Sequence, residues 1–130
     1  MSEAVNLTSI DPKLREEIAL IVGQTNQCNY CLSAHTAIAK GSGISDQEIL
    51  SARKAQSQNP KTQAILTFVK SVVDKRGKID DQEIAGLKAK GVNDTEIAEI
   101  VMIITLNLFT NYFNLVTDTK IDFPMAPKLA

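Results

Sequence analysis

Signals that start a helix recur along this chain and constrain its fold more than any other feature. Asp11-Pro12 and Asn59-Pro60 each place a helix N-cap residue before a proline, whose fixed φ angle suits the first helical turn. The capping-box pattern, an N-cap residue followed three positions later by Glu, occurs at Ser45–Glu48, Asp80–Glu83 and Asn93–Glu96. These repeated signals predict a chain built mainly of helices.

Apolar residues follow these signals at helical spacing rather than in the alternation typical of strands. Leu14, Ile18, Ile21 and Val22 share one face of a first helix that begins at Asp11-Pro12. We expect five further helices, over about 26–41, 46–57, 60–77, 80–91 and 93–114, and strand signals are nearly absent. The prediction is an all-α, single-domain bundle of about six helices over 1–130, with a core of about 11–115 and an extended tail at 118–130.

Charge and hydropathy exclude several classes of partner. The 14 Lys and Arg residues are balanced by 15 Asp and Glu residues, so no basic surface is expected to bind nucleic acid. The first 13 residues lack the basic and apolar segments of a secretory signal. The longest apolar stretch, 97–109, contains polar residues and is shorter than the roughly 20 residues needed to span a bilayer. We therefore expect a cytoplasmic protein with no membrane partner.

Both cysteines and the only histidine of the chain lie within QCNYCLSAH, residues 27–35. On a helix, spacings of three and four residues place Cys28, Cys31 and His35 on one face. With a rise of about 1.5 Å per residue, His35 lies roughly 6 Å along the axis from Cys31 and roughly 10.5 Å from Cys28. The imidazole can therefore act on Cys31, directly or through water, but not easily on Cys28.

Three kinds of site fit this cluster. A structural zinc site needs four ligands, and the chain has no other Cys or His to add to these three. A purely structural disulfide within one helical turn closes a very short loop and stabilises little. A redox centre needs thiolates, which the helix N-terminus favours at Cys28 and the imidazole favours at Cys31. We favour the redox centre, with Cys31 as nucleophile and Cys28 as the second thiol.

A longer segment, REEIALIVGQTNQCNYCLSAH (15–35), resembles the signature of the alkylhydroperoxidase D-like core within the carboxymuconolactone decarboxylase superfamily. That signature has a Glu twelve residues before the first Cys of C-x-x-C-x-x-x-H. Glu16, Cys28, Cys31 and His35 match it position by position. The segment LNLFTNYFN (106–114) also resembles the Asn-bearing last helix of such proteins, so the likeness covers about 11–115.

The resemblance implies a helical protein that forms homo-oligomers, commonly trimers or hexamers, and that has thiol peroxidase activity without a cofactor or a metal. In that chemistry Cys31 attacks a peroxide and becomes a sulfenic acid, Cys28 condenses with it, and an external dithiol reduces the resulting disulfide. Glu16 and His35 would form the proton relay that activates the thiols. The donor implied is dihydrolipoamide or a thioredoxin-like protein.

Two departures bear on the activity. The best-studied relatives have a His between the cysteines, where this chain has Tyr30, so one member of the relay is missing and turnover is expected to be slow. Enzymes that decarboxylate the muconolactone do not rely on a C-x-x-C pair, so its presence argues against that reaction here.

The predicted function is reduction of hydrogen peroxide or alkyl hydroperoxides by the Cys28 and Cys31 dithiol. Two alternatives stay open at this point: a non-redox lyase or ligand-binding relative with the same fold, and a metal-binding or redox-sensing module. A further expectation concerns Asn107, Asn111 and Asn114, which share a face of the most apolar helix. We expect their amides to form a polar seam bonded to other helices or to a neighbouring subunit.

Overall fold

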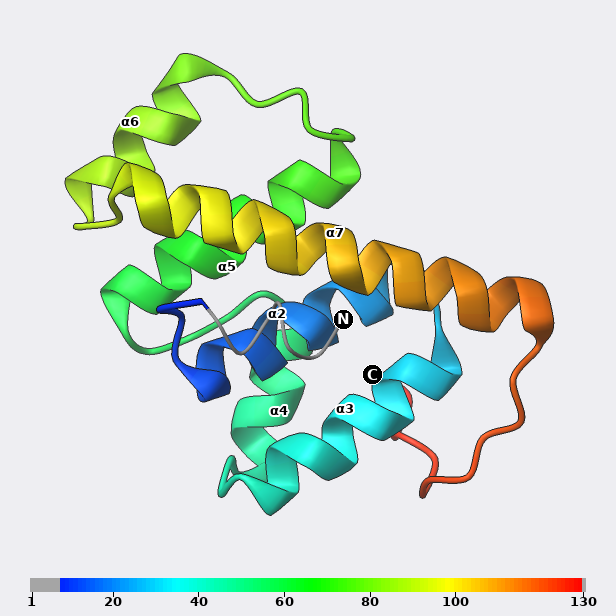
Figure 1. The fold of residues 1–130 in the computed structure, drawn as a ribbon. Helices are drawn as coiled ribbons and strands as arrows, with labels where there is room; N and C mark the ends of the chain where they lie inside the picture. The colour runs from blue at the N-terminus through cyan, green and yellow to red at the C-terminus, as the bar shows by residue number, and fades with distance from the viewer. Residues whose placement is uncertain (1–7, 130) are drawn as a thin grey trace.

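The computed structural model describes residues 8–129, and all regular structure in that range is helical (Figure 1). The predicted all-α fold of six helices is confirmed. The helices are α2 (Pro12–Thr25), α3 (Asn29–Gly41), α4 (Asp46–Arg53), α5 (Pro60–Asp74), α6 (Asp81–Ala89) and α7 (Asp94–Thr117). The prediction that the first 13 residues lack a secretory signal falls partly outside the described residues, because residues 1–7 are not described.

The predicted start signals cap the helices as expected. Side chains of Asp11 and Asn59 accept hydrogen bonds from the backbone N–H groups of Lys13 and Thr62. All three capping boxes are closed in both directions, at the starts of α4, α6 and α7. The helix starts are therefore set by local side-chain to backbone bonds.

The predicted ends are less accurate. The helix expected over 46–57 ends at Arg53, because Ala55 adopts a left-handed backbone with φ of 56°. The side chain of Gln63 holds this turn, donating to the Ala55 carbonyl and accepting from the N–H of Ser57. The last helix instead runs beyond 114 to Thr117.

Helix α2 lies at the centre of the bundle and packs against α3, α4, α5 and α7. Its residues 18–22 are all buried, as expected for a helix with neighbours on every side. The larger apolar core lies between α2, α5 and α7, and a smaller one joins α2, α3 and α4 through Leu20, Leu32, Ala39, Ile44, Ile49 and Ala52. This double packing fixes α3, which carries both cysteines, against α2.

The C-terminal tail turns back after α7 and runs to α3 without helix or strand over 119–129 (Figure 1). The Phe123 ring meets Tyr30 edge to face, with centroids 5.9 Å apart. The backbone N–H of Ala126 donates to Ser33 Oγ at 3.0 Å, and the Pro127 carbonyl accepts from Arg53 at 2.7 Å. The extended tail therefore packs on its own chain.

Among the described helices, α7 alone is long and apolar enough to cross a membrane by length and composition. The core helix of a bundle meets the same criterion. Polar side chains of α7 bond to the rest of the molecule, since Glu99 accepts from Ser9 and Asn111 accepts from Asn26. These contacts hold α7 against the bundle, although only 28% of its apolar window is buried.

The two halves of α7 differ in exposure. In the first half Ile100, Ile103 and Ile104 are at most 1% exposed. The second half carries an α7 apolar surface, defined by Phe109, Tyr112, Phe113, Leu115 and Val116, whose exposed fractions run from 48% to 85%. No described segment of the chain buries these five side chains.

Candidate redox site

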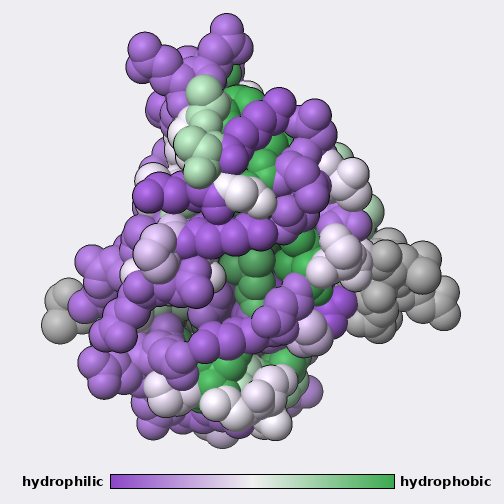
Figure 2. Space-filling model, turned by 90° about the vertical axis from the view of Figure 1, so that its left-hand side faces the viewer, coloured by the Kyte–Doolittle hydropathy of each residue, from purple (hydrophilic) through white to green (hydrophobic). Residues whose placement is uncertain are grey.

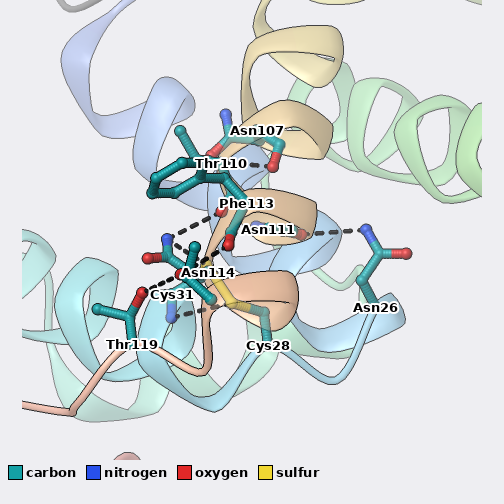
Figure 3. The surroundings of a disulfide bond; sticks show 10 residues. Asn26, Cys28, Cys31, Asn107, Thr110, Asn111, Phe113, Asn114 and Thr119 are labelled. Carbon is teal, nitrogen blue, oxygen red and sulfur yellow. Dashed lines mark hydrogen bonds between the residues drawn. A yellow bond between two sulfur atoms is a disulfide. The ribbon is translucent and has the colours of Figure 1, made fainter.

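The centre of the candidate site is a disulfide between Cys28 and Cys31, whose Cα atoms are 5.3 Å apart (Figure 3). Cys28 is the N-cap of α3, and its sulfur accepts a hydrogen bond from the N–H of Cys31 at 3.3 Å. After reduction, the same N–H and the positive end of the helix dipole favour a thiolate there. Both residues are buried, at 1% and 3% exposure.

The short link between α2 and α3 positions this disulfide. Gly23 accepts a hydrogen bond from the N–H of Cys28 at 3.0 Å, and Gln27 turns the chain with a left-handed φ of 54°. Asn26 Nδ2 donates to Asn111 Oδ1 on α7 at 3.0 Å, as Figure 3 shows. A Cβ at Gly23 would lie 3.6 Å from the Cβ of Cys31, so α2 and the second cysteine are in close contact.

Glu16 and His35 form a pair between α2 and α3. The Nδ1 atom of His35 lies 2.7 Å from a carboxylate oxygen of Glu16. The side chain of His35 is 24% exposed and that of Glu16 is 18% exposed, so both reach water. The carboxylate orients the imidazole and leaves Nε2 to exchange protons. No hydrogen bond among residues 8–129 joins this imidazole to either sulfur.

The side chain of Asn114 contacts the sulfur of Cys31. Its Nδ2 lies 3.7 Å from Cys31 Sγ and also donates to the Thr110 carbonyl at 2.8 Å (Figure 3). Sequence reasoning placed Asn114 in a polar seam and missed this contact, because the two residues lie 83 positions apart. The regular spacing of asparagines on an apolar helix was the one available signal.

The predicted seam forms only in part. Asn111 bonds Asn26 as expected, whereas Asn107 donates to the carbonyl of Ile103 in its own helix. Asn111 is fully buried, and its Nδ2 finds no partner among the described residues. The asparagines of α7 thus make three different kinds of contact.

The structure also bears on the zinc alternative. Within residues 8–129 no group of three or more His, Cys, Asp and Glu side chains is arranged to hold a metal ion. Both sulfurs are bonded to each other. In this state neither cysteine is available as a thiolate ligand.

Glu17, next to the matched Glu16, differs from it sharply. It is 6% exposed, and burial raises the pKa of its carboxyl, while the positive charge of Lys13 acts in the opposite direction. The side chain of Glu17 therefore lies in the protein interior, whereas that of Glu16 lies partly in water. Only Glu16 pairs with the imidazole.

Comparison with known protein families decides the classification. The model of the carboxymuconolactone decarboxylase family matches residues 1–70, more than half of the chain. The chain belongs to this family. The superfamily to which the sequence resemblance pointed is confirmed by this match, and an AhpD-like protein shares the fold. Among curated proteins, none matches the sequence significantly.

Solved structures share the fold at low sequence identity. An uncharacterized peroxidase-related protein from Silicibacter sp. TM1040 is 22% identical with a TM-score of 0.83, over 92% of this chain and 65% of that one. A protein of unknown function from Agrobacterium tumefaciens, described as a putative antioxidant defence protein AhpD, is 20% identical with a TM-score of 0.83, over 96% of this chain and 86% of that one.

A third neighbour is the debrominase Bmp8, solved in complex with 2,3,4-tribromopyrrole. It is 22% identical with a TM-score of 0.80, over 93% of this chain and 66% of that one. The present chain thus spans just under two thirds of the Silicibacter protein and of the debrominase. At these identities the likeness is one of fold.

Proposed function

We propose that this protein is a thiol-dependent peroxidase that reduces hydrogen peroxide or alkyl hydroperoxides through Cys31 and Cys28. The observation that carries the proposal is the disulfide at the start of α3, one helical turn from a histidine that a glutamate orients. A bond that closes so short a loop contributes little to stability, so a reversible redox role explains it better than a structural one. The Agrobacterium neighbour, a protein of unknown function described as a putative antioxidant defence protein, is consistent with the same class of chemistry.

The reaction balances with the residues present. The Cys31 thiolate attacks one peroxide oxygen, the O–O bond breaks, and the alcohol or water leaves after taking a proton, which gives a sulfenic acid. The Cys28 thiol then displaces the hydroxyl group, releasing water and forming the disulfide. An external dithiol returns two electrons and two protons by thiol–disulfide exchange. Dihydrolipoamide and thioredoxin-like proteins are donors of this class.

Glu16 and His35 serve as the proton relay in this proposal. The imidazole accepts the proton of the Cys31 thiol, through water because no direct bond joins them, and later returns a proton to the leaving oxygen. Asn114 donates its amide N–H to the Cys31 sulfur and so stabilises negative charge on it. Tyr30 in place of a relay histidine makes slow turnover the expectation.

The protein is further proposed to act as a homo-oligomer. One half of α7 exposes five large apolar side chains together. An exposed apolar patch of this kind is uncommon on a monomeric protein and is typical of an interaction surface. Phe109 and Phe113 also stack, with centroids 6.3 Å apart, which presents a flat face to a partner. Trimers or hexamers of one domain per chain, in the reducing cytoplasm, fit this proposal.

The test is steady-state hydroperoxide consumption with each of three donors: dihydrolipoamide, the thioredoxin system and glutathione. We expect turnover with a dithiol donor and none with the Cys31→Ser variant. Two results would instead identify a non-redox relative. One is that the thiols do not react with peroxide. The other is that the Cys28→Ser, Cys31→Ser double variant turns over a lactone as fast as the wild-type protein does.

A further inference from the structure

Arg53 is a buried cation to which no carboxylate of residues 8–129 bonds. It ends α4 and is 5% exposed, and its Nε and Nη1 atoms donate to the Gln24 side chain at 2.9 Å and to the Pro127 carbonyl at 2.7 Å. Both acceptors are neutral, and no carboxylate among residues 8–129 bonds the guanidinium. Burial alone lowers the pKa of Arg53. A buried charge of this kind is costly unless an opposite charge accompanies it.

A cavity of about 310 Å³ lies beside this guanidinium, between α2, α3 and the C-terminal tail. Its lining includes Arg53, Lys128 and the amide side chains of Gln24, Gln27 and Asn29, and it contains no Asp or Glu. Ser33, 1% exposed, also lines it; its oxygen accepts from Ala126, which leaves the hydroxyl proton to donate. The cavity is thus rich in donors and carries positive charge only.

Two further features suit an anion. Asn29 is the first residue of α3, a helix of 13 residues, so the positive end of the helix dipole lies at the cavity. Leu32 and Met125 add an apolar side to the lining. A volume of this size is that of a small-molecule site.

We propose that this cavity binds a small organic carboxylate, with its charged end on Arg53 and its carbon chain against Leu32 and Met125. Nε and Nη1 each donate to a neutral acceptor, so Nη2 and the second hydrogen of Nη1 remain to pair with a carboxylate, and the bound anion supplies the opposite charge that residues 8–129 do not provide. Gln27 and Asn29 flank Cys28, so the ligand site opens beside the first turn of the helix that carries the disulfide. The contact between tail and α3 forms one wall of the site.

The test measures binding on the full chain with its disulfide intact, so the result does not depend on peroxidase activity. Butyrate, its neutral analogue butyramide, and inorganic phosphate are titrated while backbone amide signals are followed by NMR. We expect saturable shifts at Asn29 and Ser33 with butyrate and binding at least about tenfold weaker with butyramide.

Variants assign the binding to this cavity. Arg53→Met removes the charge but keeps an unbranched side chain, and it is expected to weaken butyrate binding by at least about tenfold. Lys54→Met removes a positive charge from the next residue, which is exposed and outside the lining, and leaves affinity within about twofold. Should Arg53→Met fail to fold, Ser33→Ala tests the same wall and is expected to weaken binding several-fold.

Equal binding of butyrate and butyramide, or unchanged butyrate affinity in folded Arg53→Met and Ser33→Ala variants, would overturn the proposal. Saturable shifts with phosphate but not with butyrate would also overturn it, because the ligand class would then be wrong.

Discussion

The corner where α2 meets α3 and the C-terminal half of α7 lie next to each other but are built differently. At the corner the reactive groups find partners within the chain: Cys28 bonds Cys31, His35 bonds Glu16, and Asn114 approaches the sulfur. The α7 apolar surface leaves its side chains in water. The opposite end of the bundle, where α6 and the start of α7 lie, is mostly hydrophilic (Figure 2).

This contrast separates the groups that one chain brings together from the surface that a second molecule would cover. One chain brings the two cysteines, Glu16 and His35 together, so the proposed formation of the disulfide requires no neighbouring subunit. The α7 apolar surface would stabilise an assembly when a second molecule covers it, because apolar area is then removed from water. We therefore expect chemistry and assembly to be separable by mutation.

The largest expected effect is on assembly. Phe109→Ser with Val116→Ser removes two exposed apolar groups, and their combined burial is worth about 4 kcal/mol, or about 10³-fold in the dissociation constant. Light scattering after size-exclusion chromatography should report smaller particles. Val101→Ser, on the first half of α7 and 40% exposed, is the matched control and should leave the particle size unchanged. If the wild-type protein were monomeric at micromolar concentration, the claim that the α7 apolar surface mediates assembly would be wrong.

The next effect is on the chemical step. His35→Gln removes the proton relay but keeps a polar side chain, and we expect thiol oxidation by peroxide to slow about 10²-fold at neutral pH. Glu16→Gln should act in the same direction, because it weakens the hydrogen bond that orients the imidazole. Stopped-flow measurement on the reduced protein gives the rate. Rates within twofold of wild type for both variants would exclude the relay.

A smaller effect is expected at Asn114. Replacing it by Leu removes the amide that faces Cys31 Sγ and should slow thiol oxidation about tenfold, the value of one hydrogen bond to a charged group. Asn107→Leu is the control, since that amide bonds only its own helix. Equal slowing in both variants would show that the effect comes from packing of α7.

The smallest effect concerns stability. Burial raises the pKa of the Glu17 carboxyl, so the folded state binds its proton more tightly than the unfolded state does. Its favourable contribution is present below the ordinary carboxyl pKa and is lost as pH rises through the raised value. Glu17→Gln should therefore raise the melting temperature near pH 7 and lose this advantage near pH 4.

Glu48 supplies the opposite control for that experiment. Hydrogen bonds from Lys13 and Ser45 hold the pKa of its carboxyl at about 2, so its contribution is present at neutral pH and is lost as pH falls through that value. Because Glu48 is exposed, Glu48→Gln should lower the melting temperature near pH 7 only slightly. If both Glu17→Gln and Glu48→Gln changed the melting temperature near pH 7 in the same direction, the opposite pKa shifts of the two carboxyls would be contradicted.

Features that depend on a few neighbouring residues were predictable from the sequence. Helix starts follow from capping pairs such as Ser45 and Glu48. Helical spacing also predicts that Cys31 and His35 lie one turn apart on one helix, whereas Cys28, expected on the same helix, caps it with an extended backbone. The family signature added Glu16, and the structure places its carboxylate on His35.

Features that depend on distant contacts were not predictable. The approach of Asn114 to Cys31 depends on how α7 crosses α3, and the early end of α4 depends on the side chain of Gln63 in the next helix. The cavity at Arg53 forms only when the tail returns to α3. A single sequence gives no measure of such tertiary geometry.

The most direct test of the redox assignment is a single turnover without donor. Reduced protein is mixed with one equivalent of hydroperoxide, free thiols are counted, and the intact mass is measured for wild type, Cys28→Ser and Cys31→Ser. The account predicts that wild type loses two thiols per peroxide and two hydrogen atoms in mass, Cys28→Ser stops at a sulfenic acid on Cys31, and Cys31→Ser does not react. Persistence of both thiols in the wild-type protein, or equal peroxide consumption by Cys31→Ser, would contradict it.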